Sequence, residues 1–263
     1  MRGISIITIC FNQELFIART IESVITQKNV NLQYIIIDGF SKDGTLSQIN
    51  KYSNSIDLII SESDSGIYNA INKGLSFVKN DIVGIVHSGD VLLPNALAII
   101  LKTFEDNDCD VVYGDIYFDY PHAFQELHVA DHSKLNKKMS IFHPSTFIKK
   151  SVYSHEGFYD EKFRLASDYD YLLNLFLKNY VFFHLKIPLV LFQMGGMSDK
   201  QTLLRLNENF QIRNKYFGFI KACLFGVRIY SVTFFYFARK SFGHFLFGED
   251  KYYKFKKFLS FIK

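Results

Sequence analysis

Apolar runs alternate with amphipathic segments through the first third of the chain. Runs of consecutive apolar residues are typical of strands buried on both faces of a parallel sheet, and they occupy residues 4–10, 32–37, 56–61 and 82–86. Helical spacing of apolar positions follows in 15–27 and 67–78, and a further helix is expected between the second and third strands. These repeated strand–helix units predict a doubly wound, mostly parallel α/β sheet.

The pattern changes after residue 93. In chain order we expect a helix at 94–104, a strand at 111–114, an antiparallel excursion over 115–128, a loop at 134–140, a strand at 145–149, a helix at 167–177, and strands at 181–184 and 187–192 that are separated at Pro188. We therefore predict one domain over residues 1–212, with halves at 1–93 and 94–212, and a C-terminal extension over 213–263.

Acidic side chains follow three of the predicted strands. Asp38 ends the second strand, Asp64 lies just past the third and Asp90 follows the fourth. The carboxyl ends of parallel strands form the edge where open α/β sheets bind ligands, so these carboxylates are expected to converge. Carboxylates there suit a ribose hydroxyl, a base N–H, or a Mg²⁺ or Mn²⁺ ion that bridges a diphosphate. Each acid also has a purely structural interpretation, as a turn residue or a helix cap.

A second acidic segment lies at the start of the helix predicted over 167–177. It contains Asp168 and Asp170, in the first turn, where the helix dipole favours negative charge. Ser167 or Asp168 is expected to be the N-cap, and capping alone accounts for one of the acids. The other is available as a base that takes a proton from an acceptor hydroxyl.

The net charge of +4 is unevenly distributed. Residues 213–263 carry +9, which leaves −5 for residues 1–212. An acidic body argues against nucleic-acid binding, which needs a basic surface. The cationic extension is rich in Phe and Tyr, and its longest uncharged run, 229–238, is too short to span a bilayer. We expect helices that lie in a membrane interface; packing on the domain or a dimer contact is the alternative.

Short motifs along residues 4–196 give the chain a resemblance to family 2 glycosyltransferases with the GT-A fold. The matching segments are Ser5–Thr8 with Asn12, Ile35–Gly39 with Ser41 and Asp43–Thr45, Glu62–Asp64 with Gly66–Ala70 and Asn72–Gly74, His87–Asp90, and Ala166–Asp170. The resemblance implies a Rossmann-like, mostly parallel central sheet flanked by helices. It also implies that Asp38 and Asp64 contact a nucleoside, that Asp90 is the metal-binding acid of a DXD-like motif, and that Asp168 is the catalytic base.

Further residues complete the predicted site. Those assigned to nucleotide binding, besides the two acids, are Thr8, Asn12, Lys73 and Ser88. His143 is a candidate metal or phosphate ligand, although a lone histidine is more often structural. Lys73 and Lys42 are candidate phosphate contacts, although solvated lysines are the commoner case. The chain departs from the family pattern in that the DXD-like motif lacks its first acid and Ser167 stands where many relatives have Glu. No QxxRW motif of processive synthases is present, which favours a single sugar addition.

We therefore expect an inverting glycosyltransferase that uses a nucleotide sugar, by default a UDP-sugar, and a divalent metal, Mn or Mg. Its expected acceptor is a lipid-linked glycan or a polysaccharide. The alternative is a non-catalytic, nucleotide-binding scaffold at the membrane. A nucleotidyltransferase and a dinucleotide dehydrogenase are disfavoured because no glycine-rich phosphate loop follows the first strand.

The cellular setting follows from weaker signals. Three widely separated cysteines indicate reduced thiols in a reducing compartment. Together with the cationic extension they predict a cytoplasmic protein, peripheral on the inner face of a bacterial cytoplasmic membrane. An oligomer is compatible with the sequence.

Overall fold

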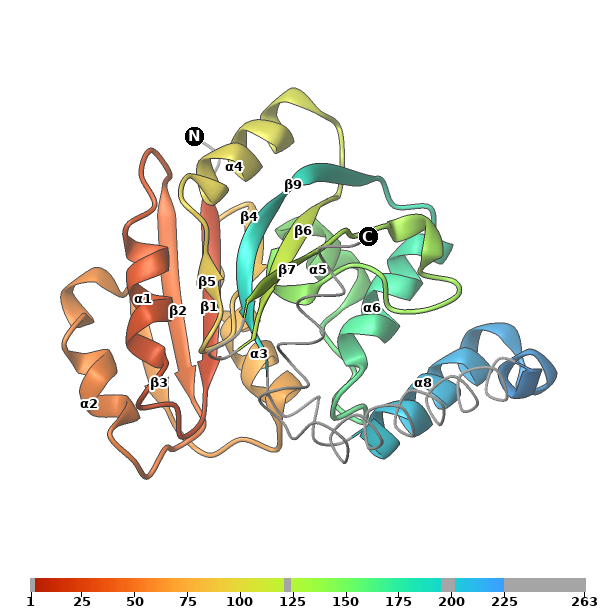
Figure 1. Cartoon of the computed structure of the whole chain (residues 1–263), viewed down its shortest axis with the longest axis horizontal. Coiled ribbons are helices and arrows are strands. Elements are labelled where there is room, and N and C mark those ends of the chain that lie inside the picture. The colour runs from red at the N-terminus through yellow and green to blue at the C-terminus, as the bar shows by residue number, and fades with distance from the viewer. Residues whose placement is uncertain (1–2, 121–123, 195–201, 225–263) are drawn as a thin grey trace. The chain divides into compact units, whose positions relative to one another are not determined.

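The structure, a computed structural model, describes residues 3–120, 124–194 and 202–224. Contacts divide the chain into two compact units, Met1–Asp119 with Glu126–Gln193 and Tyr120–Gln125 with Met194–Lys263. The first unit contains the central sheet and the helices that flank it (Figure 1). The domain boundary predicted at residue 212 stays a prediction.

Strands and helices alternate along the described part of the chain. The strands are β1 (Ile4–Cys10), β2 (Leu32–Asp38), β3 (Leu58–Ser61), β4 (Ile82–Ile85), β5 (Val91–Leu92), β6 (Val111–Asp119), β7 (Gln125–His128), β8 (Thr146–Lys149) and β9 (Phe182–Gln193). The α-helices are α1 (Ile17–Ile25), α2 (Thr45–Asn50), α3 (Ile67–Ser76), α4 (Ala96–Asp106), α5 (Lys150–Glu156), α6 (Ser167–Leu177) and α8 (Thr202–Phe217). The helix predicted at 167–177 is confirmed at both ends, whereas the short elements β5 and α5 were not predicted.

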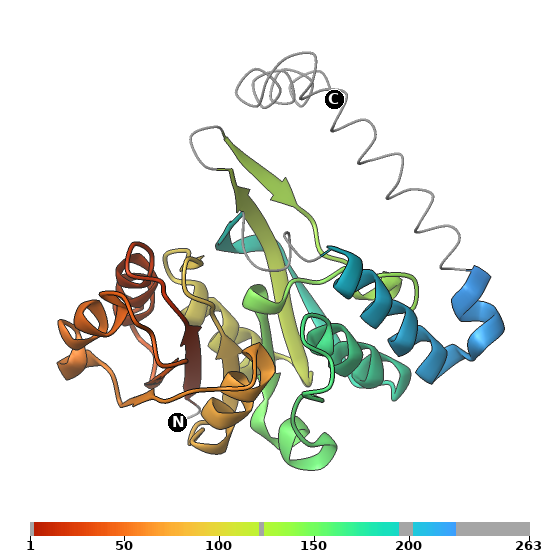
Figure 2. The same ribbon diagram turned by 90° about the horizontal axis from the view of Figure 1, so that it is seen from below.

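A parallel half-sheet of order β3-β2-β1-β4 contains the continuous apolar runs. Every residue of β1 is buried, as expected for a central strand covered on both faces. The register places Cys10 beside Asp38 and Asp38 beside Ser61, so the carboxyl ends of β1, β2 and β3 are level. Figures 1 and 2 show α1 and α2 on one face of this half-sheet and α3 on the other. The predicted doubly wound arrangement is confirmed.

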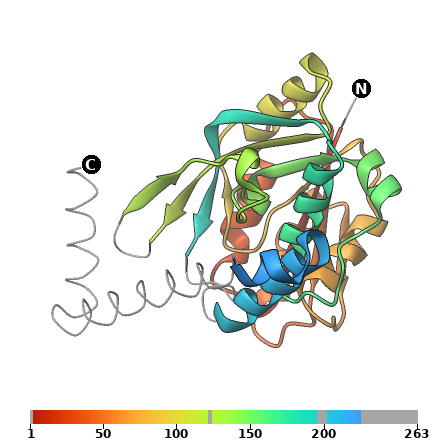
Figure 3. The ribbon, with the colours of Figure 1, turned by 90° about the vertical axis from the view of Figure 1, so that its right-hand side faces the viewer.

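The other half of the sheet is mixed, in the order β8-β6-β9-β5. β8 pairs antiparallel with both β4 and β6, while β9 lies parallel to β6 and antiparallel to β5. β7 also pairs with β6, and Figure 3 shows β6, β7 and β9 side by side. β8 therefore joins the two halves into one continuous sheet.

β9 crosses Pro188 without interruption, so the predicted break between strands 181–184 and 187–192 is wrong. Proline lacks the N–H that a ladder requires. The register between β6 and β9 shifts on either side of Asp115, which is opposite Pro188, and such a bulge accommodates a residue that cannot donate to the ladder. The strand then continues to Gln193, where it lies next to β5.

Glu156, at the end of α5, anchors the helix that carries the predicted base. Its Oε2 accepts hydrogen bonds from Lys178 Nζ (2.6 Å) and Asn174 Nδ2 (2.9 Å), and its Oε1 accepts one from the Tyr180 hydroxyl (2.8 Å). The bond from Lys178 contributes most to lowering the pKa of Glu156 to about 2. Because three donors from α6 and the segment after it converge on one carboxylate, the C-terminal end of α6 is fixed against α5.

The C-terminal extension is described only in part. α8 ends at Phe217, and residues 225–263, which include most of the predicted aromatic and cationic helices, lie outside the described residues. In the part of the chain that the structure describes, no helix combines the length and apolarity needed to cross a bilayer. The predicted interfacial role of residues 213–263 therefore stays a prediction.

Candidate active site

The carboxyl ends of the parallel strands meet at one edge of the sheet. Hydrogen bonds extend this alignment past the strands, from Gly39 N to Cys10 O (2.9 Å), from Glu62 N to Asp38 O (3.0 Å) and from Ser88 N to Ile9 O (3.1 Å). Each bond joins a residue past the end of one strand to a neighbouring strand. The segments that contain Asp38, Asp64 and Asp90 therefore leave the sheet at the same edge, as predicted.

Asp38 is fully buried and organises the loop that follows β2. Its Oδ2 accepts hydrogen bonds from Ser61 Oγ (2.6 Å) and Ser41 N (3.1 Å), and its Oδ1 accepts from Ser41 Oγ. Burial, and next the Asp38 charge, raise the pKa of the Cys10 thiol at the end of β1. Asp38 thus has several protein donors, and its predicted contact with a nucleoside stays a prediction.

Asp64 begins the segment that leads into α3. Its Oδ1 accepts a hydrogen bond from Gly66 N (3.0 Å), at the N-cap of that helix. Its Oδ2 faces the loop after β2, where a Cβ added at Gly39 would lie 2.6 Å away. The N-cap of α3 is Gly66, so Asp64 does not cap this helix. One oxygen of the half-buried Asp64 carboxylate closes a local turn onto Gly66 N, and the second oxygen lies beside the Asp38 loop.

Asn12 and Thr8 both have protein partners. Asn12 adopts a left-handed conformation (φ 52°), donates its N–H to Ser41 Oγ (2.8 Å) and accepts from Lys42 N at its Oδ1 (2.9 Å). It thus ties the loop after β1 to the loop after β2. Thr8 is fully buried inside β1, and its hydroxyl lies 3.1 Å from the Tyr34 hydroxyl. The nucleotide roles predicted for these two residues stay predictions, and the structure adds no support for Thr8.

Lys73 and Ser88 differ in whether their side chains already have partners within the protein. Lys73 Nζ forms an ion pair with Glu62 Oε1 (2.9 Å) and donates to Ser63 O (2.9 Å), so its charge holds the segment after β3. Ser88 Oγ is buried and has no hydrogen-bond partner among the described residues. Of these two predicted phosphate or nucleotide contacts, Ser88 is the one with an unused polar atom.

Asp90 lies in a tight turn held from α1. The Thr20 hydroxyl donates to Asp90 O (2.8 Å) and accepts from Gly89 N (2.9 Å). Asp90 Oδ1 accepts from Gln193 N (3.2 Å), while Oδ2 is buried without a partner in the described chain. Burial raises the pKa of Asp90 to about 8, against the opposing effect of the Gln193 N–H. Asp90 does not cap α4, whose N-cap is Asn95, so the capping interpretation fails for this acid.

Asp168 lies in the first turn of α6 and is linked to α3. Its Oδ1 accepts hydrogen bonds from the Tyr68 hydroxyl (2.9 Å) and from Tyr169 N (2.8 Å). Removal from water raises the pKa of this carboxyl, and the Tyr68 bond opposes that rise. The N-cap of α6 is Ala166, so the expectation that Ser167 or Asp168 is the cap is wrong by one or two residues. Asp168 makes no capping bond, and its carboxylate is turned towards Tyr68 instead.

Histidine and tyrosine side chains surround Asp168, and most of them were not predicted. His87 Nε2 lies 3.4 Å from His143 Nδ1, and His143 Nε2 lies 2.9 Å from the Tyr159 hydroxyl. Burial lowers the pKa of His87 to about 3 and that of His143 to about 4, so both are neutral near pH 7. The nearby Asp168 charge opposes part of the fall in the His87 pKa, so His87 lies near Asp168, and His87 O accepts a hydrogen bond from Asp90 N (3.0 Å). It therefore links the predicted base to the turn that contains Asp90.

The donor set available for a divalent cation is centred on Asp90. Its buried, unpartnered Oδ2 fits a cation, because a hard divalent ion favours carboxylate oxygen. Nowhere in the described ranges do three His, Cys, Asp or Glu side chains converge in a way that could hold a metal. Both ring nitrogens of His143 already have partners, so its predicted metal role stays a prediction and requires that one partner be displaced. Other oxygen donors must complete any cation site here.

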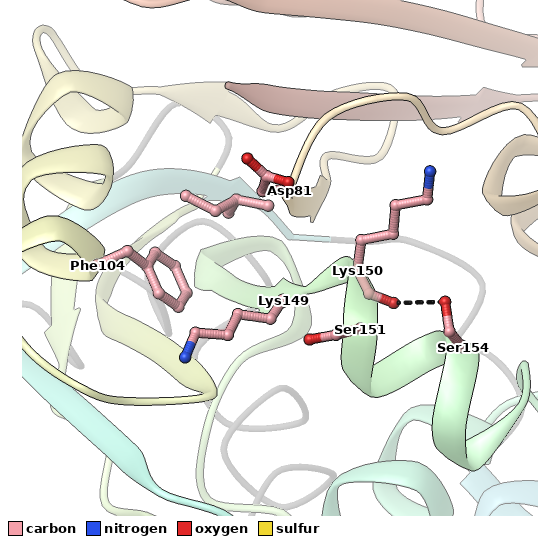
Figure 4. Close-up of a pocket in the computed structure, with 7 residues that line it drawn as sticks. Asp81, Phe104, Lys149, Lys150, Ser151 and Ser154 are labelled. Carbon is pink, nitrogen blue, oxygen red and sulfur yellow. Dashed lines mark hydrogen bonds between the residues drawn. The ribbon is translucent and has the colours of Figure 1, made fainter. Parts of the chain in front are cut away.

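A separate pocket of about 510 Å³ lies at the opposite end of β4. Its lining residues are Asp81, Ile82, Phe104, Lys149, Lys150, Ser151 and Ser154 (Figure 4). Asp81 and Ile82 are at the amino end of β4, whereas Asp90 follows its carboxyl end. None of the predicted site residues lines this pocket, so it is distinct from the candidate active site.

Comparison with known sequences shows the family. The model of glycosyl transferase family 2 matches residues 5–167. Chondroitin synthase of Pasteurella multocida is 31% identical over 187 residues, which are 65% of this chain but only 18% of that protein. A PGL/p-HBAD biosynthesis glycosyltransferase of Mycobacterium tuberculosis is 24% identical over 219 residues, which are 77% of this chain and 83% of that protein.

Solved structures share the fold. Staphylococcus aureus TarS in complex with UDP-GlcNAc has a TM-score of 0.68 at 15% identity, over 81% of this chain and 64% of that chain. The mannosyltransferase PcManGT from Pyrobaculum calidifontis, in complex with GDP-Man and Mn²⁺, has a TM-score of 0.65 at 17% identity, over 81% of this chain and 64% of that chain. The family match, the strand-edge acids and the shared architecture lead to one conclusion. The chain belongs to glycosyl transferase family 2 and has the GT-A fold.

Proposed function

We propose that the protein is an inverting glycosyltransferase that moves one sugar from a UDP-sugar to a hydroxyl of a lipid-linked or polysaccharide acceptor, with a divalent metal. The observation that supports this most is the linked set of acids at the sheet edge. Asp64 Oδ1 accepts from Gly66 N at the start of α3, and the Tyr68 hydroxyl of α3 donates to Asp168. His87, near Asp168, accepts a hydrogen bond from Asp90 N at its backbone oxygen. The proposed base and the proposed cation ligand therefore belong to connected segments.

Asp168 is the proposed base of the transfer. Its carboxylate accepts the proton of the acceptor hydroxyl while the hydroxyl oxygen forms a bond to the anomeric carbon. The bond from that carbon to the diphosphate oxygen breaks, and its electron pair leaves with UDP. Attack on the face opposite the leaving group inverts the anomeric configuration. A raised pKa suits this role, because a base is most effective when its pKa approaches the working pH.

The donor is proposed to lie along the sheet edge, with its nucleoside near Asp38 and Asp64 and its diphosphate near Ser88 and Asp90. A divalent cation bound at Asp90 would neutralise charge on the leaving diphosphate. UDP is the proposed nucleotide because TarS, which shares the fold, is described in complex with UDP-GlcNAc. The relatives do not agree on one acceptor, so the acceptor class rests on the sequence interpretation.

Incubation with a panel of UDP-sugars and candidate acceptors tests this function. We expect release of UDP with formation of a glycoside whose anomeric configuration, measured by NMR, is opposite to that of the donor. A product of retained configuration would contradict the inverting mechanism. Binding of UDP-sugars without turnover on any acceptor would instead favour the non-catalytic scaffold.

Removal of the Tyr68 hydroxyl is predicted to change the pH dependence of the transfer. The Tyr68 bond stabilises the ionised form of Asp168, so Tyr68→Phe raises the pKa of this base further. The acid limb of the kcat/KM profile then moves to higher pH, because more alkaline solution is needed to deprotonate the base. Tyr52→Phe is the matched control, since the Tyr52 hydroxyl binds Glu22, which lies on α1. An unmoved acid limb in Tyr68→Phe would show that Tyr68 does not act on the base.

The membrane association and the location at the inner face of the cytoplasmic membrane also remain proposals. Their support is the net charge of +9 on residues 213–263 together with the aromatic content of that extension. Each basic residue near an anionic surface contributes about 1 kcal/mol. The full chain is expected to co-sediment with vesicles that contain anionic lipid and to be released by high salt. Recovery in the supernatant at low salt would contradict the proposal.

A further inference from the structure

We propose that the side-chain oxygen of Gln193 is a second protein ligand of the cation at Asp90, in place of the first acid that the DXD-like motif lacks. This inference rests on the metal-assisted transfer proposed above and names a residue that the motif does not contain. Gln193 lies more than 100 residues from Asp90 in the sequence, at the end of β9. The fold alone brings the two together.

The pairing of β5 with β9 sets this juxtaposition. Val91 is opposite Leu191 and Leu92 is opposite Val190, in an antiparallel register. Continued by two residues, the same register places Gln193 opposite Gly89. The contacts agree, because Gln193 N donates to Asp90 Oδ1 (3.2 Å) and a Cβ added at Gly89 would lie 3.2 Å from Gln193 Oε1. Gly89 also has φ +102°. Glycine therefore suits this turn because it tolerates the positive φ and because it leaves room for Gln193 Oε1.

Two unused oxygen acceptors result from this arrangement. Asp90 Oδ2 and Gln193 Oε1 are both buried, and neither has a hydrogen-bond partner among the described residues. A buried acceptor left unsatisfied is unfavourable because it has lost water without gaining a partner, so two of them on adjoining segments indicate a ligand that satisfies both. Carboxylate and carbonyl oxygens are the donors that Mg²⁺ and Mn²⁺ prefer.

Arg19 and His143 are less suitable ligands. Arg19 interacts electrostatically with Asp90, but its guanidinium repels a cation, and its Nη2 lies 3.6 Å from Asp119 Oδ2. His143 has partners at both ring nitrogens. One carboxylate and one amide oxygen leave the remaining positions of the ion to substrate phosphates and water, which is the usual composition of a Mg²⁺ site.

Mn²⁺ titration in the presence of UDP, followed by the EPR signal of free Mn²⁺, tests this ligand role without an activity assay. Gln193→Met keeps the length of the side chain but removes the oxygen, and we expect Mn²⁺ to bind about tenfold more weakly. Gln193→Glu adds a charge to the same position and is expected to bind Mn²⁺ more tightly than the wild type. Gln48→Met on α2, where the amide oxygen accepts from Lys51 Nζ (2.7 Å), is the matched control and should leave the affinity unchanged.

The outcomes separate this inference from the proposed function. Wild-type affinity in both Gln193→Met and Gln193→Glu, with binding lost in Asp90→Asn, would overturn the role of Gln193 and leave the metal-assisted transfer intact. Absence of Mn²⁺ binding in the wild type with UDP would overturn both. If Gln193→Met does not fold, as judged by circular dichroism without metal, the tighter binding expected of Gln193→Glu decides the matter.

Discussion

Asp168→Asn is expected to lower kcat by about 10³-fold or more while the Kd for the UDP-sugar stays within about twofold of the wild type. The amide keeps the size of the carboxyl group but cannot accept the acceptor proton, and general-base catalysis typically contributes 10²–10⁴-fold. The donor contacts proposed at Asp38, Asp64 and Asp90 are not altered. UDP release gives kcat, and calorimetric titration of the UDP-sugar gives Kd.

Asp170→Asn is the matched control for this result. Asp170 is in the same first turn of α6 and is also buried, but the hydrogen bond from Tyr68 goes to Asp168. We expect the Asp170 variant to retain turnover within about tenfold of the wild type. If Asp170→Asn loses the activity and Asp168→Asn keeps it, the base is Asp170.

Asp90→Asn is expected to abolish Mn²⁺-dependent stabilisation and to lower turnover by about 10²-fold or more, since a metal contributes several kcal/mol of transition-state charge stabilisation. The change removes the one carboxylate proposed to hold the cation. Thermal unfolding with UDP, in the presence and absence of Mn²⁺, and UDP release at saturating donor measure the two effects. Equal Mn²⁺ responses in variant and wild type would show that the cation binds elsewhere.

The same substitution is predicted to stabilise the protein when no cation is added. Burial raises the pKa of Asp90 from its usual 3.8 to about 8. Between these values the folded protein binds more protons than the unfolded chain, so wild-type stability falls as the pH rises from about 4 to 8. Asparagine has no charge to bury, and the variant should unfold about 3 °C or more above the wild type at pH 8. This difference should fade towards pH 4, and its absence at pH 8 would contradict the assigned environment of Asp90.

The parts of the site that follow local patterns could be predicted from the sequence. Consecutive apolar residues identified β1, β2 and β4 as buried strands, and parallel strands necessarily end at a common edge. The sequence alone therefore predicts Asp38, Asp64 and Asp90 at that edge. The bounds of α6 were likewise predictable, because the apolar spacing of the helix and its acidic first turn are local features.

The partners of these residues could not be predicted, because they come from distant segments. Gln193 reaches Asp90 only because β9 continues past Pro188 through a bulge, and proline in the sequence indicated a break. The pairing of Glu62 with Lys73, in the helix that follows, is closer in the sequence, but the pattern of residues does not specify it either.

Hydrogen-bond partners also limit the availability of two predicted site residues, Thr8 and His143, for a ligand. Tyr34 engages Thr8 across neighbouring strands, and His143 faces His87 and Tyr159 rather than an open space. A residue type at a strand end thus indicated the kind of chemistry, while its hydrogen-bond partners determined which atoms remain available for it.

The most direct measurement is the unfolding temperature of the wild-type protein with a panel of nucleotide sugars, each with and without Mn²⁺. If the acids at the sheet edge hold both the donor and the cation, at least one UDP-sugar should raise the unfolding temperature. Mn²⁺ should then increase this rise. If no nucleotide sugar changes the unfolding temperature in either condition, the edge does not hold a donor and the proposed site is contradicted.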